Sequence, residues 1–230
     1  MRLAKPCIDI GLTTGPGAAM LDFWGGEAGL VYEGPLPIRR GHVQHRFRVG
    51  ASVMKVNLRQ NAPSPAPPSG YVELIIARPD LATPRALRDP DGNAVSFWPL
   101  GEGGLGQMGV RLKVRDLARH RAFYRDALGL EETPSPWPGA AMFAAGETRL
   151  ILEEDPAAAV DSGFEGPGWR YITFQVFQCD AAHAAVLAAG GREAMAPTTL
   201  GDTARISMIT DPDGNWIELS QRRSLVGTLD

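Results

Sequence analysis

The sequence predicts an α+β fold in two tandem domains, and internal repetition carries this prediction. The stretch Asp-Pro-Asp-Gly-Asn, followed by an apolar run, occurs at residues 89–98 and again at 211–219. In each copy Asp, Pro and Gly favour a turn, and the apolar residues that follow favour a strand. Two pairs of strand-like segments also recur at an offset of 100 residues: 9–14 with 109–114, and 71–74 with 171–174. We therefore expect domains at residues 1–101 and 107–224.

Composition places the chain among ordinary globular proteins. It has 230 residues, 44% of them hydrophobic and 21% charged, which is enough for two small domains. The net charge of −3 predicts neither a nucleic-acid nor a membrane partner. The absence of a spanning apolar run or a signal-peptide core favours the cytoplasm. Cys7 and Cys179 lie outside any CxxC motif, so no disulfide framework is expected.

The first domain begins with a strand predicted over residues 7–14, with Ile8, Ile10 and Leu12 on one face. A short helix is expected to follow and to end near Trp24, stopped by Gly25-Gly26. A strand at 30–33 comes next.

Residues 42–49 and 52–59 predict a hairpin that turns at Gly50-Ala51. That turn sets Arg46 opposite Lys55 and leaves one polar face on the hairpin, composed of His42, Gln44, Arg46, Arg48, Lys55, Asn57 and Arg59. An extended loop over 61–70 and a strand over 71–77 should follow. No helix fits before Asp89, and the second copy has 22 more residues at this point. The first domain is therefore expected to be degenerate and to lack a crossover helix.

The second domain is more regular. A strand at 110–114 leads to a helix capped by Asp116 and stopped by Gly129. The expected elements after it are strands at 140–144, 148–153 and 171–176, a helix at 180–189, strands at 204–209 and 216–220, and a frayed tail.

Three segments of the second domain, 109–117, 123–130 and 211–219, together resemble the vicinal-oxygen-chelate superfamily. That superfamily includes glyoxalase I, bleomycin-resistance proteins and extradiol dioxygenases. The resemblance implies βαβββ modules, two per cupped domain, with curved mixed sheets. It also implies a cup in which members often hold a divalent metal.

The resemblance assigns metal-ligand positions to the first and last strands of each module. In the second domain these are Gly109, Ile151, Tyr171 and Glu218, and in the first domain Asp9, Lys55, Tyr71 and Ser96. A divalent ion needs several converging donors, which one carboxylate does not supply. We therefore expect no cofactor, and an ion pair between Asp9 and Lys55. The alternative is a divalent metal held by Glu218, with His42 as the best-placed histidine.

Strand alternation predicts a ligand site in the cup of the second domain. Tyr171, Thr173, Gln175, Trp216 and Glu218 share one face, and Tyr71 and Trp98 occupy similar places in the first domain. Arg111 and Arg149 are expected on the concave side, where they either hold an anion beside Glu218 or are strand charges and partners for Glu153. A cup with aromatic walls and few polar groups suits a small aromatic or amphipathic molecule, similar to the bleomycin-resistance branch. A tyrosine hydroxyl, an arginine or the ligand should satisfy the Glu218 carboxylate.

The rival hypothesis is a metal-dependent lyase, isomerase or dioxygenase of the same superfamily. Glu218 would then be a metal ligand or the base, and Tyr171 the proton donor. A purely structural partner protein is the third hypothesis. Both a monomer and a homodimer are compatible with the sequence, since tandem duplication can replace the dimer that single-domain members form.

Overall fold

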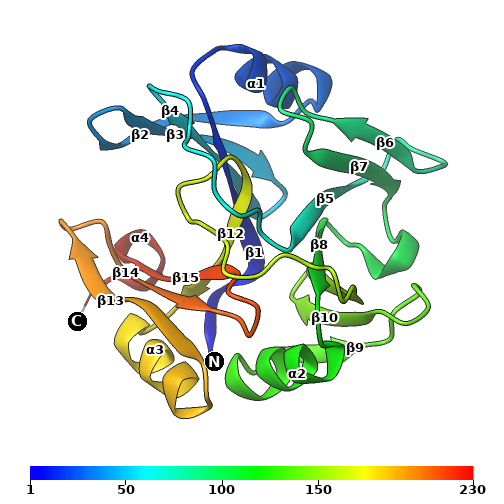
Figure 1. Ribbon diagram of the computed structural model, residues 1–230. Helices are drawn as coiled ribbons and strands as arrows, with labels where there is room; N and C mark the ends of the chain where they lie inside the picture. Colours follow the sequence, from blue (N-terminus) through cyan, green and yellow to red (C-terminus); the bar gives the residue numbers. More distant parts are fainter. Residues whose placement is uncertain (230) are drawn as a thin grey trace.

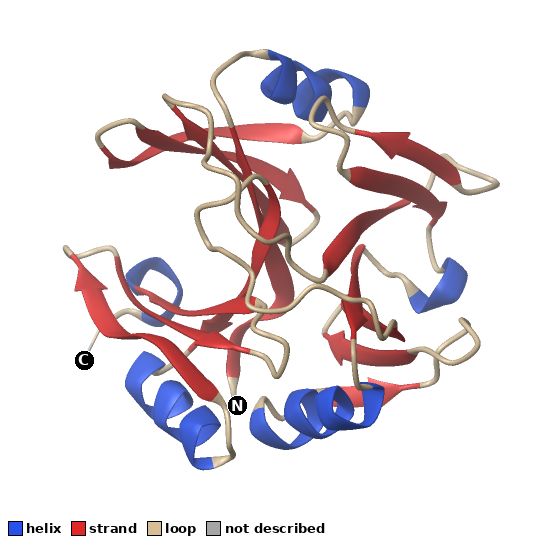
Figure 2. Cartoon of the chain, viewed as in Figure 1, coloured by secondary structure: helices blue, strands red, loops and turns tan. Residues whose placement is uncertain are grey.

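Two open mixed β-sheets form the framework of the chain, of which the computed structural model describes residues 1–229 (Figure 1). Short helices lie at the periphery of the sheets (Figure 2). Within residues 1–229 no helix is both long and apolar enough to cross a membrane.

The eight-stranded sheet has the order β13-β14-β15-β12-β1-β4-β3-β2. In chain order its strands are β1 (Leu3–Thr14), β2 (Val31–Arg39), β3 (His42–Val49), β4 (Ser52–Arg59), β12 (Gly168–Val176), β13 (Arg192–Leu200), β14 (Ala204–Thr210) and β15 (Trp216–Arg222). The seven-stranded sheet has the order β6-β7-β5-β8-β11-β10-β9. Its strands are β5 (Tyr71–Arg78), β6 (Arg85–Arg88), β7 (Ala94–Pro99), β8 (Met108–Val114), β9 (Glu131–Thr133), β10 (Ala141–Ala145) and β11 (Thr148–Glu154).

Each sheet takes strands from both halves of the chain. In the eight-stranded sheet β1 pairs antiparallel with β12, which sets Gly11 opposite Tyr171. In the seven-stranded sheet β5 pairs antiparallel with β8. The division into domains at residues 1–101 and 107–224 stays a prediction. The ligand cup was expected within the second domain, whereas the strand pairing builds each sheet, and so each cup, from both halves of the chain.

The predicted hairpin is confirmed in its register. β3 and β4 pair with Val49 opposite Ser52 and Arg46 opposite Lys55. Gly50 takes a positive φ of 59°, which a two-residue turn requires. The missing crossover helix is also confirmed, because only the short strand β6 lies between β5 and β7, whereas helix α3 (Cys179–Ala188) follows β12.

The helices correct one prediction and confirm another. Helix α1 (Ala19–Asp22) does not stop at Gly25-Gly26 but continues as a π-helical turn to Glu27. Burial of Trp24, which is fully covered, outweighs the conformational cost of the two glycines. Helix α2 (Leu117–Ala122), extended by a π-helical turn to Ala127, is capped as predicted, because the Asp116 carboxylate accepts a hydrogen bond from the Arg119 amide at 2.9 Å.

Five elements were not predicted. β6, β9 and β13 are edge or near-edge strands that bury little, so their sequences lack the alternation that reveals a strand. Helix α4 (Arg223–Val226) forms where a frayed tail was expected. A 3-10 turn at Glu102–Gly104 connects β7 to β8.

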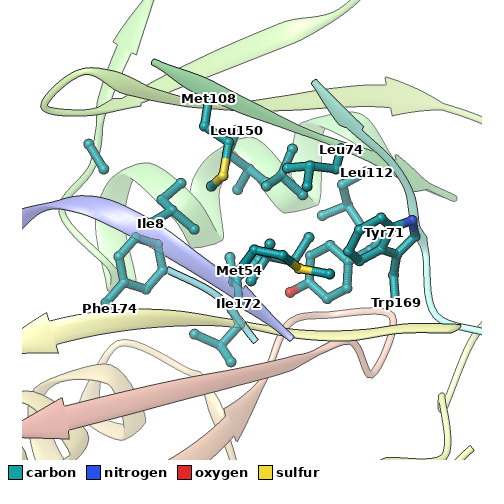
Figure 3. Packing of buried hydrophobic residues seen from close by; sticks show 14 of the residues in the cluster. Ile8, Met54, Tyr71, Leu74, Met108, Leu112, Leu150, Trp169, Ile172 and Phe174 are labelled. Atoms are coloured by element: carbon teal, nitrogen blue, oxygen red, sulfur yellow. The ribbon is translucent and has the colours of Figure 1, made fainter. Parts of the chain in front are cut away.

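The main core lies between the two sheets (Figure 3). One side of it comes from the eight-stranded sheet, including Ile8, Met54, Ile172 and Phe174, and the other side from the seven-stranded sheet, including Leu74, Met108, Leu112 and Leu150. Because side chains alternate along a strand, the residues between these ones point away from the core. Each sheet therefore has an outer face on which a cup can form. Tyr71 is in the core rather than a cup, since the pairing with β8 shifts register between Tyr71 and Glu73.

Candidate functional site

The outer face of the seven-stranded sheet is filled by its own side chains. Ile75, Leu105 and Ile151 form a second apolar cluster with Ala140 and Met142, flanked by Trp98 and Trp137. Gly109 lies beneath this cluster, where a Cβ atom would come within 2.8 Å of Leu105 Cδ2. Gly109 and Ile151, two of the family's ligand positions, are therefore packing residues here.

Arg111 and Arg149 belong to this filled face. Arg111 forms ion pairs with Glu73 at 2.9 Å and Glu153 at 3.2 Å, and its guanidinium lies 5.7 Å from the centre of the Trp137 ring. Arg149 donates to the carbonyl oxygen of Gly146 at 2.7 Å. Of the two expectations for these arginines, the structure agrees with the strand charges, since Arg111 pairs with Glu153. An anion held beside Glu218 is ruled out for them, because β8 and β11 belong to one sheet and β15 to the other.

The outer face of the eight-stranded sheet holds a cavity of about 410 Å³, which we call the cup. Apolar side chains from β2, β13 and β14 form its walls, among them Leu36, Ile38, Met195, Leu200, Ile206 and Met208. Polar side chains from β3, β4, β12 and β15 form its floor, namely His42, Gln44, Lys55, Asn57, Tyr171, Glu218 and Arg222. The volume and the contrast between walls and floor are those of a small-molecule site.

Lys55 occupies the floor of the cup beside Glu218. Its Nζ atom lies 2.6 Å from Thr173 Oγ1 and 3.3 Å from Glu218 Oε2, and the residue is only 2% exposed. Burial lowers the pKa of Lys55, while the Glu218 carboxylate acts in the opposite direction. The partner of Glu218 is therefore a lysine, and not the tyrosine, arginine or ligand that the sequence suggested.

The predicted ion pair between Asp9 and Lys55 is wrong. The parallel register of β1 and β4 sets Gly11, and not Asp9, beside Lys55. The Asp9 carboxylate instead binds Lys5 Nζ at 2.7 Å and accepts from the Val53 amide at 2.8 Å. Its second oxygen accepts from Gln175 Nε2 at 3.1 Å.

Tyr171 is held by two side-chain amides. Asn57 Nδ2 donates to the Leu12 carbonyl at 3.1 Å, which fixes the orientation of that amide, and it also lies 3.2 Å from the Tyr171 hydroxyl. Gln44 Nε2 donates to Asn57 Oδ1 at 3.1 Å and reaches the same hydroxyl at 3.3 Å. Both neighbours of the hydroxyl are donors, so its oxygen accepts.

The Tyr171 proton finds no acceptor within residues 1–229. Burial, with the Glu218 charge as the next cause, raises the pKa of Tyr171 well above its ordinary value. Tyr171 is therefore a neutral hydrogen-bond donor available to the cup, and its raised pKa makes it a weak general acid at neutral pH.

The Tyr171 ring fits against a glycine and a loop residue. A Cβ atom at Gly11 would lie 2.2 Å from Tyr171 Cε1, so only glycine allows this approach. Phe164, from the loop between β11 and β12, packs 5.4 Å from the Tyr171 ring and 4.9 Å from the Trp216 ring. Trp216 Nε1 donates to the Ser162 carbonyl at 2.7 Å, which anchors that loop.

The structure thus brings together five of the seven predicted ligand residues on one face, with different roles. Tyr171 and Glu218 line the cup. Thr173 and Gln175 are buried and hold Lys55 and Asp9, while Trp216 positions Phe164.

His42, the alternative metal ligand, lines the cup but is already engaged. Its Nε2 atom lies 3.0 Å from Asn57 Oδ1, and because that oxygen is an acceptor, Nε2 carries the proton. Burial lowers the pKa of His42, so the ring is neutral near pH 7. Lys55, and not His42, contacts Glu218.

Residues 106–219 match the family model of the Glyoxalase/Bleomycin resistance protein/Dioxygenase superfamily. The chain belongs to this superfamily. Among solved structures, glyoxalase I from Zea mays is 17% identical, with a TM-score of 0.77 over 96% of this chain and 92% of that chain. A putative dioxygenase from Bacillus subtilis is 11% identical, with a TM-score of 0.73 over 96% and 86%. At these identities the likeness shows the fold alone. No curated protein matches the chain.

The donor set of the cup does not fit the divalent metal that superfamily members often hold. Lys55 stands at a ligand position, and its ammonium repels a cation beside the Glu218 carboxylate. In the described part of the chain no three His, Cys, Asp or Glu residues converge on one point. The cup could bind a divalent ion only if Lys55 moved away from Glu218 or lost its proton.

Two signals could have found the missed site residues. The predicted polar face of the hairpin already grouped His42, Gln44, Lys55 and Asn57. Arg222 follows Glu218 by four residues and so shares its face by alternation. Nothing local in the sequence indicates that these two groups meet.

Proposed function

We propose that the cup of the eight-stranded sheet binds a small, mainly apolar organic molecule, with the Lys55–Glu218 pair in place of a divalent ion. The observation that carries the proposal is this pair on the floor of a 410 Å³ cavity with apolar walls. The ammonium satisfies the carboxylate without a metal, and the walls supply area to bury an apolar body.

The floor gives the bound molecule its orientation. Tyr171 offers an oriented hydroxyl proton, because Gln44 and Asn57 occupy its oxygen. A few placed polar groups in an apolar site fix orientation in this way. Phe164 covers the Tyr171 side of the cup and is available to stack on an aromatic ring.

The test combines metal analysis with binding. The purified chain is dialysed against a chelator, its metal content is measured, and a panel of small aromatic and aliphatic molecules is titrated by calorimetry. We expect at least one molecule to bind with the same affinity before and after chelation. The Lys55→Met variant should lose affinity, because the floor loses the cation that Glu218 needs.

Lys113→Met is the matched control, since Lys113 lies on the seven-stranded sheet and pairs with Asp155 at 2.9 Å. It should bind as the wild type does. Stoichiometric tightly held metal, together with binding that requires it, would overturn the proposal in favour of the metal-dependent alternative that uses Glu218.

A further inference from the structure

The formal charge of the cup is positive whatever the state of its central pair. The charged residues that line it are Lys55, Glu218 and Arg222. Lys55 and Glu218 together contribute zero, whether the shared proton is on nitrogen or on oxygen. His42 is a neutral donor to Asn57. One positive charge, that of Arg222, is left over.

Arg222 has no partner of its own. Within residues 1–229 its side chain forms neither an ion pair nor a hydrogen bond, although it is half-buried and lines the cup. By contrast, Arg205 on the neighbouring strand β14 pairs with Asp180 and donates to one of its carboxylate oxygens at 2.6 Å. A guanidinium in a partly apolar cavity presents a planar fork of N–H donors that matches a carboxylate.

The neighbours of Arg222 leave room for such a group. Arg222 ends β15 on the same face as Glu218, and its partner across the sheet is Ala204, a small residue that also lines the cup.

We infer that the molecule bound in the cup is a monocarboxylate with an apolar body, and that Arg222 binds its carboxylate. This inference rests on the proposed function and adds the chemical class of the ligand. A single negative charge matches the one unpaired positive charge on the lining, whereas a dianion would place an uncompensated charge near Glu218. The walls formed by Ile206, Met208 and Met195 take the apolar body.

The test uses pairs of molecules that differ only in charge. A series of aryl and alkyl carboxylates, such as 4-phenylbutyrate, and the neutral amide of each are titrated against the wild type. Each carboxylate that binds should bind about tenfold more tightly than its amide, because a charge-assisted hydrogen bond replaces a neutral one. In Arg222→Gln the carboxylate should fall to the affinity of the amide, while the amide keeps its wild-type affinity.

Arg205→Gln is the matched control, because Arg205 lies on the adjacent strand and pairs with Asp180 on helix α3. It should preserve the tenfold preference. Circular dichroism and thermal unfolding establish that both variants fold. If the amides bind as tightly as the carboxylates, or if Arg222→Gln weakens both equally, this inference falls and the proposed function stands. If no member of either series binds, both are overturned.

Discussion

The Lys55→Met substitution removes the ammonium that faces Glu218 and keeps an unbranched side chain in its place. Lys55 is 2% exposed and Glu218 is 8% exposed, so the carboxylate is left without a partner in a largely buried position. Removing one member of a buried ion pair costs about 3–5 kcal/mol. The cup adjoins Glu218 and admits water, so we expect the lower end, about 3 kcal/mol. For a chain of this length, the unfolding midpoint should fall by roughly 6–12 °C.

A double-mutant cycle isolates the interaction. Glu218→Gln in the Lys55→Met background removes the stranded charge, so the double variant should recover at least about 1 kcal/mol relative to the sum of the single changes. Urea unfolding at pH 7 gives the four free energies. Additive single changes, or a Lys55→Met variant within 1 kcal/mol of the wild type, would refute the assignment of Lys55 as the partner of Glu218.

Three further predictions concern other parts of the fold. Gly11→Ala should destabilise the chain by about 1–3 kcal/mol in thermal unfolding, because the added methyl group displaces the Tyr171 ring. Gly26→Ala is the control, since a Cβ atom there meets nothing within 4 Å. His120 lies 3.5 Å from Asp211 and 3.6 Å from Asp213; burial alone would lower its pKa, but the two carboxylates raise it above 6.5. The stabilisation from protonated His120 is full below pH 6.5 and is lost as the pH rises through the folded pKa. His120→Asn should therefore lower the free energy of urea unfolding more at pH 6 than at pH 8.5, and an equal loss at both pH values would contradict the prediction. Asp116→Ala removes the cap of α2 and should lower the free energy of unfolding by about 1 kcal/mol. An unchanged unfolding midpoint in calorimetry would contradict this prediction.

Much of the local structure could be predicted, because it depends on residues close together in the chain. The Gly50 turn fixed the register of β3 and β4, and therefore the polar face that carries Lys55 and Asn57. Asp116 was recognised as a cap from its position before an apolar run. The alternation of β12 and β15 placed Tyr171 and Glu218 on one face.

Weak local patterns account for the misses within single elements. The edge strand β13 is mostly exposed, so its sequence carries no alternation. The continuation of helix α1 through Gly25-Gly26 is stabilised by burial of Trp24 in the core, which glycine propensities alone cannot indicate.

The sequence alone determined the two repeated halves, the superfamily and the faces of the individual strands, since periodicity and turn residues act over a few positions. Only the tertiary structure decided which faces meet. Pairing of β1 with β12 joins residues more than 150 positions apart, and that contact brings Lys55 to Glu218 and leaves Arg111 on the other sheet. The same packing filled one cup with Leu105 and Met142 and left the other open. Strand partners are chosen by the total burial of the folded chain, and no local pattern encodes that sum.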